Sequence, residues 1–239
     1  IRTELWWDTA VIANAGSDAE FNAPVGATAG MIDIDAEGTV LTDGTATLTA
    51  GGGNVDIDAN DSVVLGNNVN ASADVLITAD DSISVTAQIG NTAAVNVDLD
   101  AVSGSISTTE LITATGNLTA DAGTDIALDA LTVTGTVDVG QAIQPTGMID
   151  FNDAVDAGGA ITADAGGDII VDGTMDSDAA VDLDAGNMLD VNNTIGGTVI
   201  TLNANGDVDT TGAITADGTN VTITGDADVV IGAVVDAPN

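Results

Sequence analysis

Apolar and polar residues alternate in short segments along most of the chain, and these segments recur at nearly constant spacing. One series has the form apolar-x-apolar-x followed by a small or polar residue, and its members lie 19 to 24 residues apart. Alternation with a period of two is typical of a β-strand with one buried face, and β-branched residues at the apolar positions favour the same structure. The ten segments end at Ala36, Ala59, Ala79, Ala101, Ala120, Gln141, Ala165, Ala185, Ala204 and Gly225.

Two further series share this period. One consists of apolar pairs, and the other has a single large apolar residue per repeat. Three short strands in each repeat of about 20 residues predict a β-solenoid. We expect an all-β, right-handed parallel β-helix of about ten coils. The pairs include Ile83 with Val85, Ile126 with Leu128, Ile149 with Phe151, Ile169 with Val171, Leu189 with Val191, and Val229 with Ile231. The single residues are Val69, Ile89, Leu111, Val133, Val155, Met175, Ile195 and Ile214.

In such a fold, equivalent residues of successive coils lie on top of one another. Aligning the ends of the first series predicts that Leu118 stacks on Leu99, with Gly116 on Val97. The aliphatic residues then form a continuous core, and each of them contributes about 1.5–3 kcal/mol when fully buried. With strands ~4.8 Å apart, ten coils give a rod of roughly 48 Å.

The charge of the chain is strongly one-sided. It has 38 acidic residues and a single basic one, Arg2, for a formal net charge of −37. This composition argues against binding to nucleic acid or to an anionic membrane, because both require Lys and Arg. The chain also has no Cys and no His, which removes thiol chemistry and the most common general base. No apolar run approaches the ~18 residues of a membrane span.

Outward positions of the first series carry many carboxylates. Hard oxygen ligands suit Ca²⁺, so these columns could bind calcium weakly and without a dedicated site. The alternative is an acidic surface that keeps separate rods soluble and apart. Neither requires a cofactor. The candidate metal ligands are Asp33, Asp35, Asp56, Asp58, Asp98, Asp100, Asp182 and Asp184.

The two ends of the chain differ from its middle. Residues 1–30 interrupt the pattern and hold three of the four aromatic residues, so we expect an N-terminal cap or a subunit-docking segment. The solenoid is expected over residues 31–239 with an open C-terminal end, and residues 141–153 are expected to form a loop on one face. Candidate subunit contacts are Trp6, Trp7, Phe21, Val229, Ile231, Val234 and Val235.

Segments such as GNLTADAGTDIALDA (116–130) and ITADAGGDIIVDG (161–173) resemble the haemagglutinin repeats of filamentous-haemagglutinin-type exported adhesins. The resemblance covers approximately residues 31–233. It implies a right-handed β-helix that is secreted or carried on a bacterial surface. The excess of Asp and the lack of Lys depart from the family, and no functional residue can be transferred.

These observations favour a structural role over catalysis. We expect a subunit of an extracellular filament, surface fibre or adhesin stalk that assembles head to tail with copies of itself, with divalent cations or glycans as further possible partners. One alternative is a polysaccharide-active enzyme using paired carboxylates such as Asp98 and Asp100. Another is an ice-binding solenoid, suggested by Thr-x-Thr segments at residues 45–49, 132–136 and 221–224.

Overall fold

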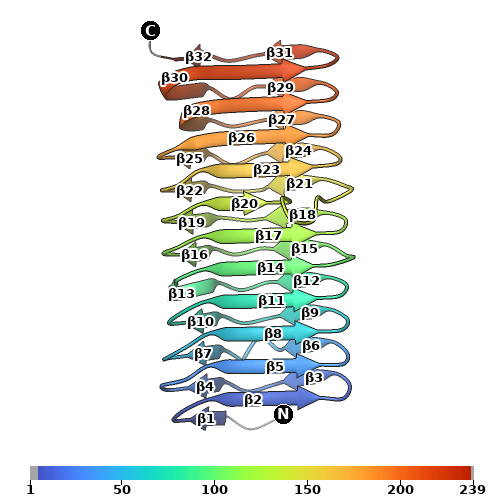
Figure 1. The fold of residues 1–239 in the computed structure, drawn as a ribbon, viewed down its shortest axis with the longest axis vertical. Helices are drawn as coiled ribbons and strands as arrows, with labels where there is room; N and C mark the ends of the chain where they lie inside the picture. The colour runs from blue at the N-terminus through green and yellow to red at the C-terminus, as the bar shows by residue number, and fades with distance from the viewer. Residues whose placement is uncertain (1–4, 238–239) are drawn as a thin grey trace.

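The computed structural model describes residues 5–237, with only the backbone described for residues 5, 6, 91–93 and 219. The chain forms a right-handed β-solenoid, in which parallel strands stack along one axis and the two termini lie at opposite ends of a rod (Figure 1). This confirms the fold class expected from the sequence. The described residues contain no helix.

Three faces of stacked strands build the rod. Face 1 consists of β2 (Val11–Ala15), β5 (Ile32–Ala36), β8 (Val55–Ala59), β11 (Val75–Ala79), β14 (Val97–Ala101), β17 (Leu118–Ala122), β20 (Val137–Val139), β23 (Ile161–Ala165), β26 (Ala180–Ala185) and the second halves of β28 (Ile195–Ala204) and β30 (Ile214–Gly225). Face 2 consists of β3 (Ala19–Phe21), β6 (Val40–Thr42), β9 (Val63–Leu65), β12 (Ile83–Val85), β15 (Ile106–Thr108), β18 (Ile126–Leu128), β21 (Ile149–Phe151), β24 (Ile169–Val171), β27 (Leu189–Val191), β29 (Val208–Thr210) and β31 (Val229–Ile231). Face 3 consists of β1 (Leu5–Trp7), β4 (Val25–Ala27), β7 (Leu48–Ala50), β10 (Val69–Ala71), β13 (Ile89–Ala94), β16 (Ile112–Ala114), β19 (Leu131–Val133), β22 (Val155–Ala157), β25 (Met175–Ser177), the first halves of β28 and β30, and β32 (Val235–Asp236).

The core is a set of aliphatic columns along the rod axis. On face 1, Ile34 stacks on Ile57, and Ile57 stacks on Ile77, all with at most 1% of their surface exposed. The residues between them point outward, as the alternating pattern predicts. Each strand hydrogen-bonds to the strands of the coils above and below, so the backbone satisfies its own polar groups.

The predicted alignment of one coil is wrong by two residues. Leu118 stacks on Val97 rather than on Leu99, and Ala120 and Ala122 follow it on the inward side of β17. A shift of two residues leaves the same side chains facing inward, so alternation alone cannot distinguish the two alignments. Gly116 lies in the turn before β17, where a Cβ would stand 2.6 Å from the Val95 carbonyl oxygen.

Two positions of the third series also require correction. Ile112, not Leu111, stacks between Ile89 and Leu131, and Leu131 takes the place expected for Val133. Leu111 is only partly buried, and its carbonyl accepts a hydrogen bond from the Ile89 N–H at 3.2 Å. Leu111 and Ile112 are adjacent apolar residues, so the sequence alone does not say which of them faces inward. Ala114 is buried, and with a period of two this places Ile112 on the inward side.

The solenoid already includes the described residues 5–30, which were expected to interrupt it. Strands β2, β3 and β4 pair in parallel with β5, β6 and β7, so residues 11–27 form a complete coil in register with the next one. The pattern was hidden because Ala13 takes the inward position that Ile34 occupies in the next coil. Whether this coil acts as a cap or as a docking segment stays a prediction.

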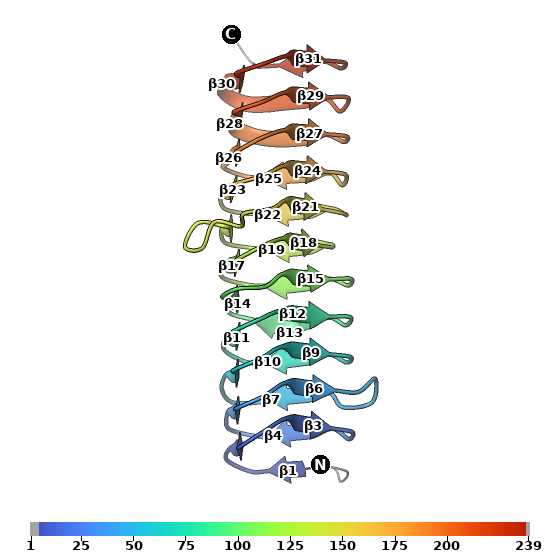
Figure 2. The same cartoon turned by 90° about the vertical axis from the view of Figure 1, so that its right-hand side faces the viewer.

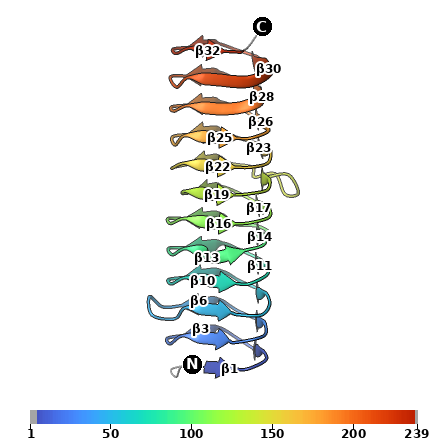
Figure 3. The same cartoon turned by 90° about the vertical axis from the view of Figure 1, so that its left-hand side faces the viewer.

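Two loops project from the rod on different sides (Figures 2 and 3). Residues 43–47 connect β6 to β7, and residues 140–148 connect β20 to β21. The second loop overlaps the predicted range 141–153 but begins one residue earlier and ends at residue 148, because β21 begins at Ile149. It leaves the coil at Gly140, whose φ of 74° favours glycine, and returns at the buried Pro145.

Stability is expected to depend on the inward columns. Leu183→Ala should lower the free energy of unfolding by about 2–5 kcal/mol, because fully buried Leu183 stacks between Ala163 and Leu202 and its truncation leaves a cavity. The matched control is Thr201→Ala on the adjacent coil, where an outward side chain should change it by less than about 0.5 kcal/mol. Urea unfolding followed by circular dichroism measures both, and equal effects would contradict the assigned facing.

Candidate functional site: the acidic face and the two ends

Stacking gathers the carboxylates of face 1 into two outward columns. The first column contains Ile12, Asp33, Asp56, Leu76, Asp98, Thr119, Asp138, Thr162, Asp182, Thr201 and Thr222. The second contains Asn14, Asp35, Asp58, Thr78, Asp100, Asp121, Asp164, Asp184, Asn203 and Thr224, with β20 ending before this position. Successive members of a column are one strand spacing apart, about 4.8 Å.

The eight predicted metal ligands fall into three separate groups. Asp33, Asp35, Asp56 and Asp58 lie together on the adjacent strands β5 and β8. Leu76 and Thr78 on β11 separate this group from the second, which is Asp98 and Asp100 on β14. The third group, Asp182 and Asp184, lies further along the rod on β26. The carboxylates therefore share one face without converging on a single point.

The corrected register of β17 brings in a residue that the sequence alignment missed. Asp121 lies directly beside Asp100, where Thr119 was expected, and Thr119 instead lies beside Asp98. One Asp121 oxygen accepts hydrogen bonds from the N–H groups of Ala142 and Ile143 at 2.9 and 3.1 Å. Asp121 thus anchors the 140–148 loop.

Neutral side chains relieve part of the repulsion along the columns. The Thr119 hydroxyl donates to Asp98 at 2.5 Å, and the Thr162 hydroxyl donates to Asp138 at 2.8 Å. Placed between two acidic coils, a threonine removes one charge and supplies a donor to a neighbouring carboxylate.

Where carboxylates are direct neighbours, their protonation is favoured. Partial burial raises the pKa of Asp56, and the charges of Asp33, Asp35 and Asp58 raise it further. Burial also raises the pKa of Asp33, with Asp35 as the second cause.

The same causes act further along the rod. Burial raises the pKa of Asp100, with a further rise from the charges of Asp121 and Asp98. For Asp182, burial again raises the pKa first, followed by the charges of Asp184 and Asp164.

No group of three or more Asp and Glu side chains within the described residues is arranged to hold a metal ion. Calcium binding at the columns therefore stays a prediction of weak association. The residues that the structure describes also include no helix long and apolar enough to span a membrane.

The residues proposed for a polysaccharide-active enzyme and for an ice-binding solenoid lie at several separate places on the rod. Asp98 and Asp100 both face outward on β14, two residues apart. Of the Thr-x-Thr segments, residues 221–224 lie on face 1, whereas residues 132–136 begin on face 3 and 45–49 begin in the β6–β7 loop. These threonines do not form one column.

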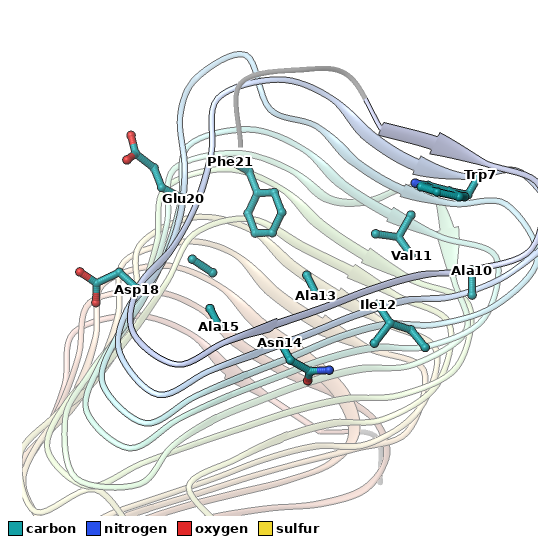
Figure 4. A pocket seen from close by; sticks show the side chains of 11 residues that line it. Trp7, Ala10, Val11, Ile12, Ala13, Asn14, Ala15, Asp18, Glu20 and Phe21 are labelled. Carbon is teal, nitrogen blue, oxygen red and sulfur yellow. The ribbon is translucent and has the colours of Figure 1, made fainter.

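The N-terminal end of the rod is hollow. A depression of about 620 Å³ is lined by Trp7, Val11, Ala13, Ala15 and Phe21, together with neighbouring residues of the first coil. Figure 4 shows Phe21 directed into the coil and Trp7 lying near Val11. Phe21 is 1% exposed and so belongs to the core, whereas Trp7 is 56% exposed. The side chain of Trp6 lies outside the described part of the structure.

The C-terminal end presents the apolar side chains of the last coil. Val229 and Ile231 on β31 occupy inward positions yet are 43% and 47% exposed, because no strand of the described residues covers them. Val234 and Val235 are exposed as well. The last described coil is therefore uncovered on faces 1 and 2, and an open C-terminal end of the solenoid stays a prediction.

Comparisons of the chain with protein-family models, curated proteins and solved structures find no match. The resemblance to haemagglutinin-repeat adhesins thus stays a prediction from the sequence.

The acidic columns predict that mild acidification stabilises the protein. A carboxyl whose pKa is higher in the folded than in the unfolded state destabilises the fold at neutral pH, and this penalty is relieved as the pH falls through the folded pKa. The melting temperature should therefore rise as the pH falls from 7 toward about 4, near the pKa of an unperturbed Asp. Asp56→Asn should raise it at pH 7, and the gain over wild type should shrink as the pH approaches about 4.

Asp43→Asn is the control of opposite sign. Hydrogen bonds from the Thr45 hydroxyl and N–H lower the pKa of Asp43, so its ionised form is favoured in the fold and its loss should not stabilise the protein at pH 7. A drop in melting temperature for Asp56→Asn at pH 7 would count against the repulsion between the columns.

Proposed function

We propose that this protein is a structural subunit of an extracellular filament, surface fibre or adhesin stalk, and that it assembles by end-to-end stacking of solenoids. One contrast carries the proposal. The sides of the rod carry acidic columns. The C-terminal end exposes the apolar residues Val229 and Ile231, and the first coil has a depression beside the exposed Trp7. The outer strands of faces 1 and 2 at both ends have an edge without a partner among the described residues. Unpaired strand edges recruit further strands.

The polarity of the strands favours a head-to-tail contact. All strands run parallel to their neighbours, so the upper edge of the last coil presents the hydrogen-bonding pattern that the lower edge of the first coil complements. A contact between two different surfaces repeats without closing when its rotation does not form a ring, and it then generates a filament.

The first and last coils also match in size. The strands of the first coil begin at Val11, Ala19 and Val25, and those of the last begin at Val221, Val229 and Val235 on the same three faces. Val221 is the face 1 position of β30, and the spacing is eight and then six residues in both coils. A second copy placed on the first could therefore continue all three faces without a change in coil shape.

The charge of the sides gives the filament a second property. Parallel filaments repel each other through the acidic columns, which keeps them separate in solution. The same charge opposes end-to-end contact, because Asp18 and Glu20 at one end approach Asp226 and Asp228 at the other. Monovalent salt or divalent cations at the columns would screen this repulsion.

Electron microscopy of the purified protein tests the proposal. Eleven coils predict a single rod of roughly 53 Å, so filaments should show lengths in multiples of this value. Raising NaCl from about 10 to 150 mM, or adding millimolar Ca²⁺, should lengthen them, because the Debye length falls from about 30 to 8 Å. Single rods at every protein, salt and calcium concentration would overturn the proposal.

A further inference from the structure

The three faces of the rod do not hold the same number of strands. Among the residues that the structure describes, faces 1 and 2 each have eleven strands, whereas face 3 has twelve, from β1 to β32. The difference arises because the described strands begin and end on the same face. It has a direct consequence for the end-to-end stacking proposed above, on which this inference rests.

Stacking two copies leaves too little room on face 3. If β2 of the second copy pairs with β30 of the first, and β3 pairs with β31, faces 1 and 2 continue without a gap. On face 3, one strand position then remains between the face 3 part of β30 and β4 of the second copy. Both β32 of the first copy and β1 of the second are directed to it, because β32 pairs with β30 and β1 pairs with β4.

We propose that β1 of the incoming copy occupies this position and that β32 of the receiving copy is displaced. The receiving surface is thus the end of the solenoid that β32 covers, and its partner is the N-terminal coil of a second copy. In the free rod, β32 acts as a removable cap on face 3.

The pairing of the two strands favours β1. It pairs with β4 over three residues, and the Trp7 carbonyl accepts a hydrogen bond from the Thr28 N–H at 2.8 Å. By contrast, β32 pairs over two residues, Val235 and Asp236, and one of these carries a charge. Displacing β32 breaks the hydrogen bond from the Ile214 N–H to the Val234 carbonyl at 2.9 Å and a ladder one residue shorter than that of β1, and it moves a carboxylate away from the junction.

Side-chain size favours the same choice. In the register of face 3, β1 of the incoming copy would place Trp7 between Ala27 of its own copy and Ala216 of the receiving copy. Ala27 and Ala216 are both buried and small, so they leave room for an indole ring. On the other faces, the register places Ala13 over Ile223 and Ala19 over Val229, which pairs small with large residues at the hollow N-terminal end.

A repeated turn contact points to the same register. The carboxylate of Asp207 accepts a hydrogen bond from the Asp228 N–H at 3.0 Å, and that of Asp18 accepts one from the Thr39 N–H at 3.0 Å. Asp228 lies at the equivalent position of the last coil, and the stacked register brings the N–H of Asp18 of the second copy over it. The junction would repeat a contact that already joins coils within the rod.

Two truncations of the full chain test the proposal. A chain that ends after Ala233 lacks β32, and the matched control ends after Ala237 and keeps it. The readout is the protein concentration at which half of the material sediments as filaments, checked by electron microscopy. Loss of β32 should lower this concentration about tenfold, as expected for removing the competition of a few backbone hydrogen bonds, and the control should match the full chain.

Trp7→Ala in the chain that ends after Ala233 separates β1 insertion from a general effect of truncation. It should raise the half-sedimentation concentration again, and Trp7→Phe should restore part of the loss. If the chain ending after Ala233 assembles less well than the full chain, β32 holds the position and this inference is overturned while end-to-end assembly stands. If no variant forms filaments, the proposed function fails, and this inference fails with it.

Discussion

The hydrogen bonds between successive coils are the interaction on which the whole molecule depends. Every strand points its N–H and C=O groups along the rod axis, so a coil has almost no backbone partners within itself and exists only on top of another coil. This constraint places each residue directly over its equivalents one coil away. The aliphatic core, the outward columns and the unfinished ends are three consequences of it.

Stacking that gathers Ile34, Ile57 and Ile77 into a dry column also forces Asp33 beside Asp56. The fold therefore concentrates charge on its surface as unavoidably as it concentrates apolar area in its interior. Leu76, Thr119 and Thr162 interrupt the first column. Partial burial nevertheless raises the pKa of Asp182 between Thr162 and Thr201, with the charges of Asp184 and Asp164 as further causes. A carboxylate at a turn behaves differently, because Asp18 and Asp207 each accept a backbone N–H from the next coil and so stabilise the stacking.

The sequence was sufficient for the fold because alternation with a period of two determines which side chains face inward. It was insufficient for the register of individual coils. Leu118 could shift by two residues without changing its facing, and only the close approach of Gly116 to the preceding turn distinguishes the two alignments. The same shift concealed Asp121 as the neighbour of Asp100, because the sequence alignment placed Thr119 at that position of the column. The first coil was missed for a different reason, because Ala13 gives a weaker apolar signal than Ile34 at the same position of the next coil.

The ends follow from the same constraint as the middle. A coil edge that lacks a neighbour leaves a full set of backbone groups and core side chains to be covered, and the exposed Val229 and Ile231 mark that deficit at one end. In any solenoid, strands that start and finish on one face give that face one strand more than the others. Continuing the rod with a second copy so that each face meets its own equivalent then brings two strands to one position. Under the stacking proposed above, β32 and β1 compete for that position, and the strand that pairs over more residues with its own coil should keep it.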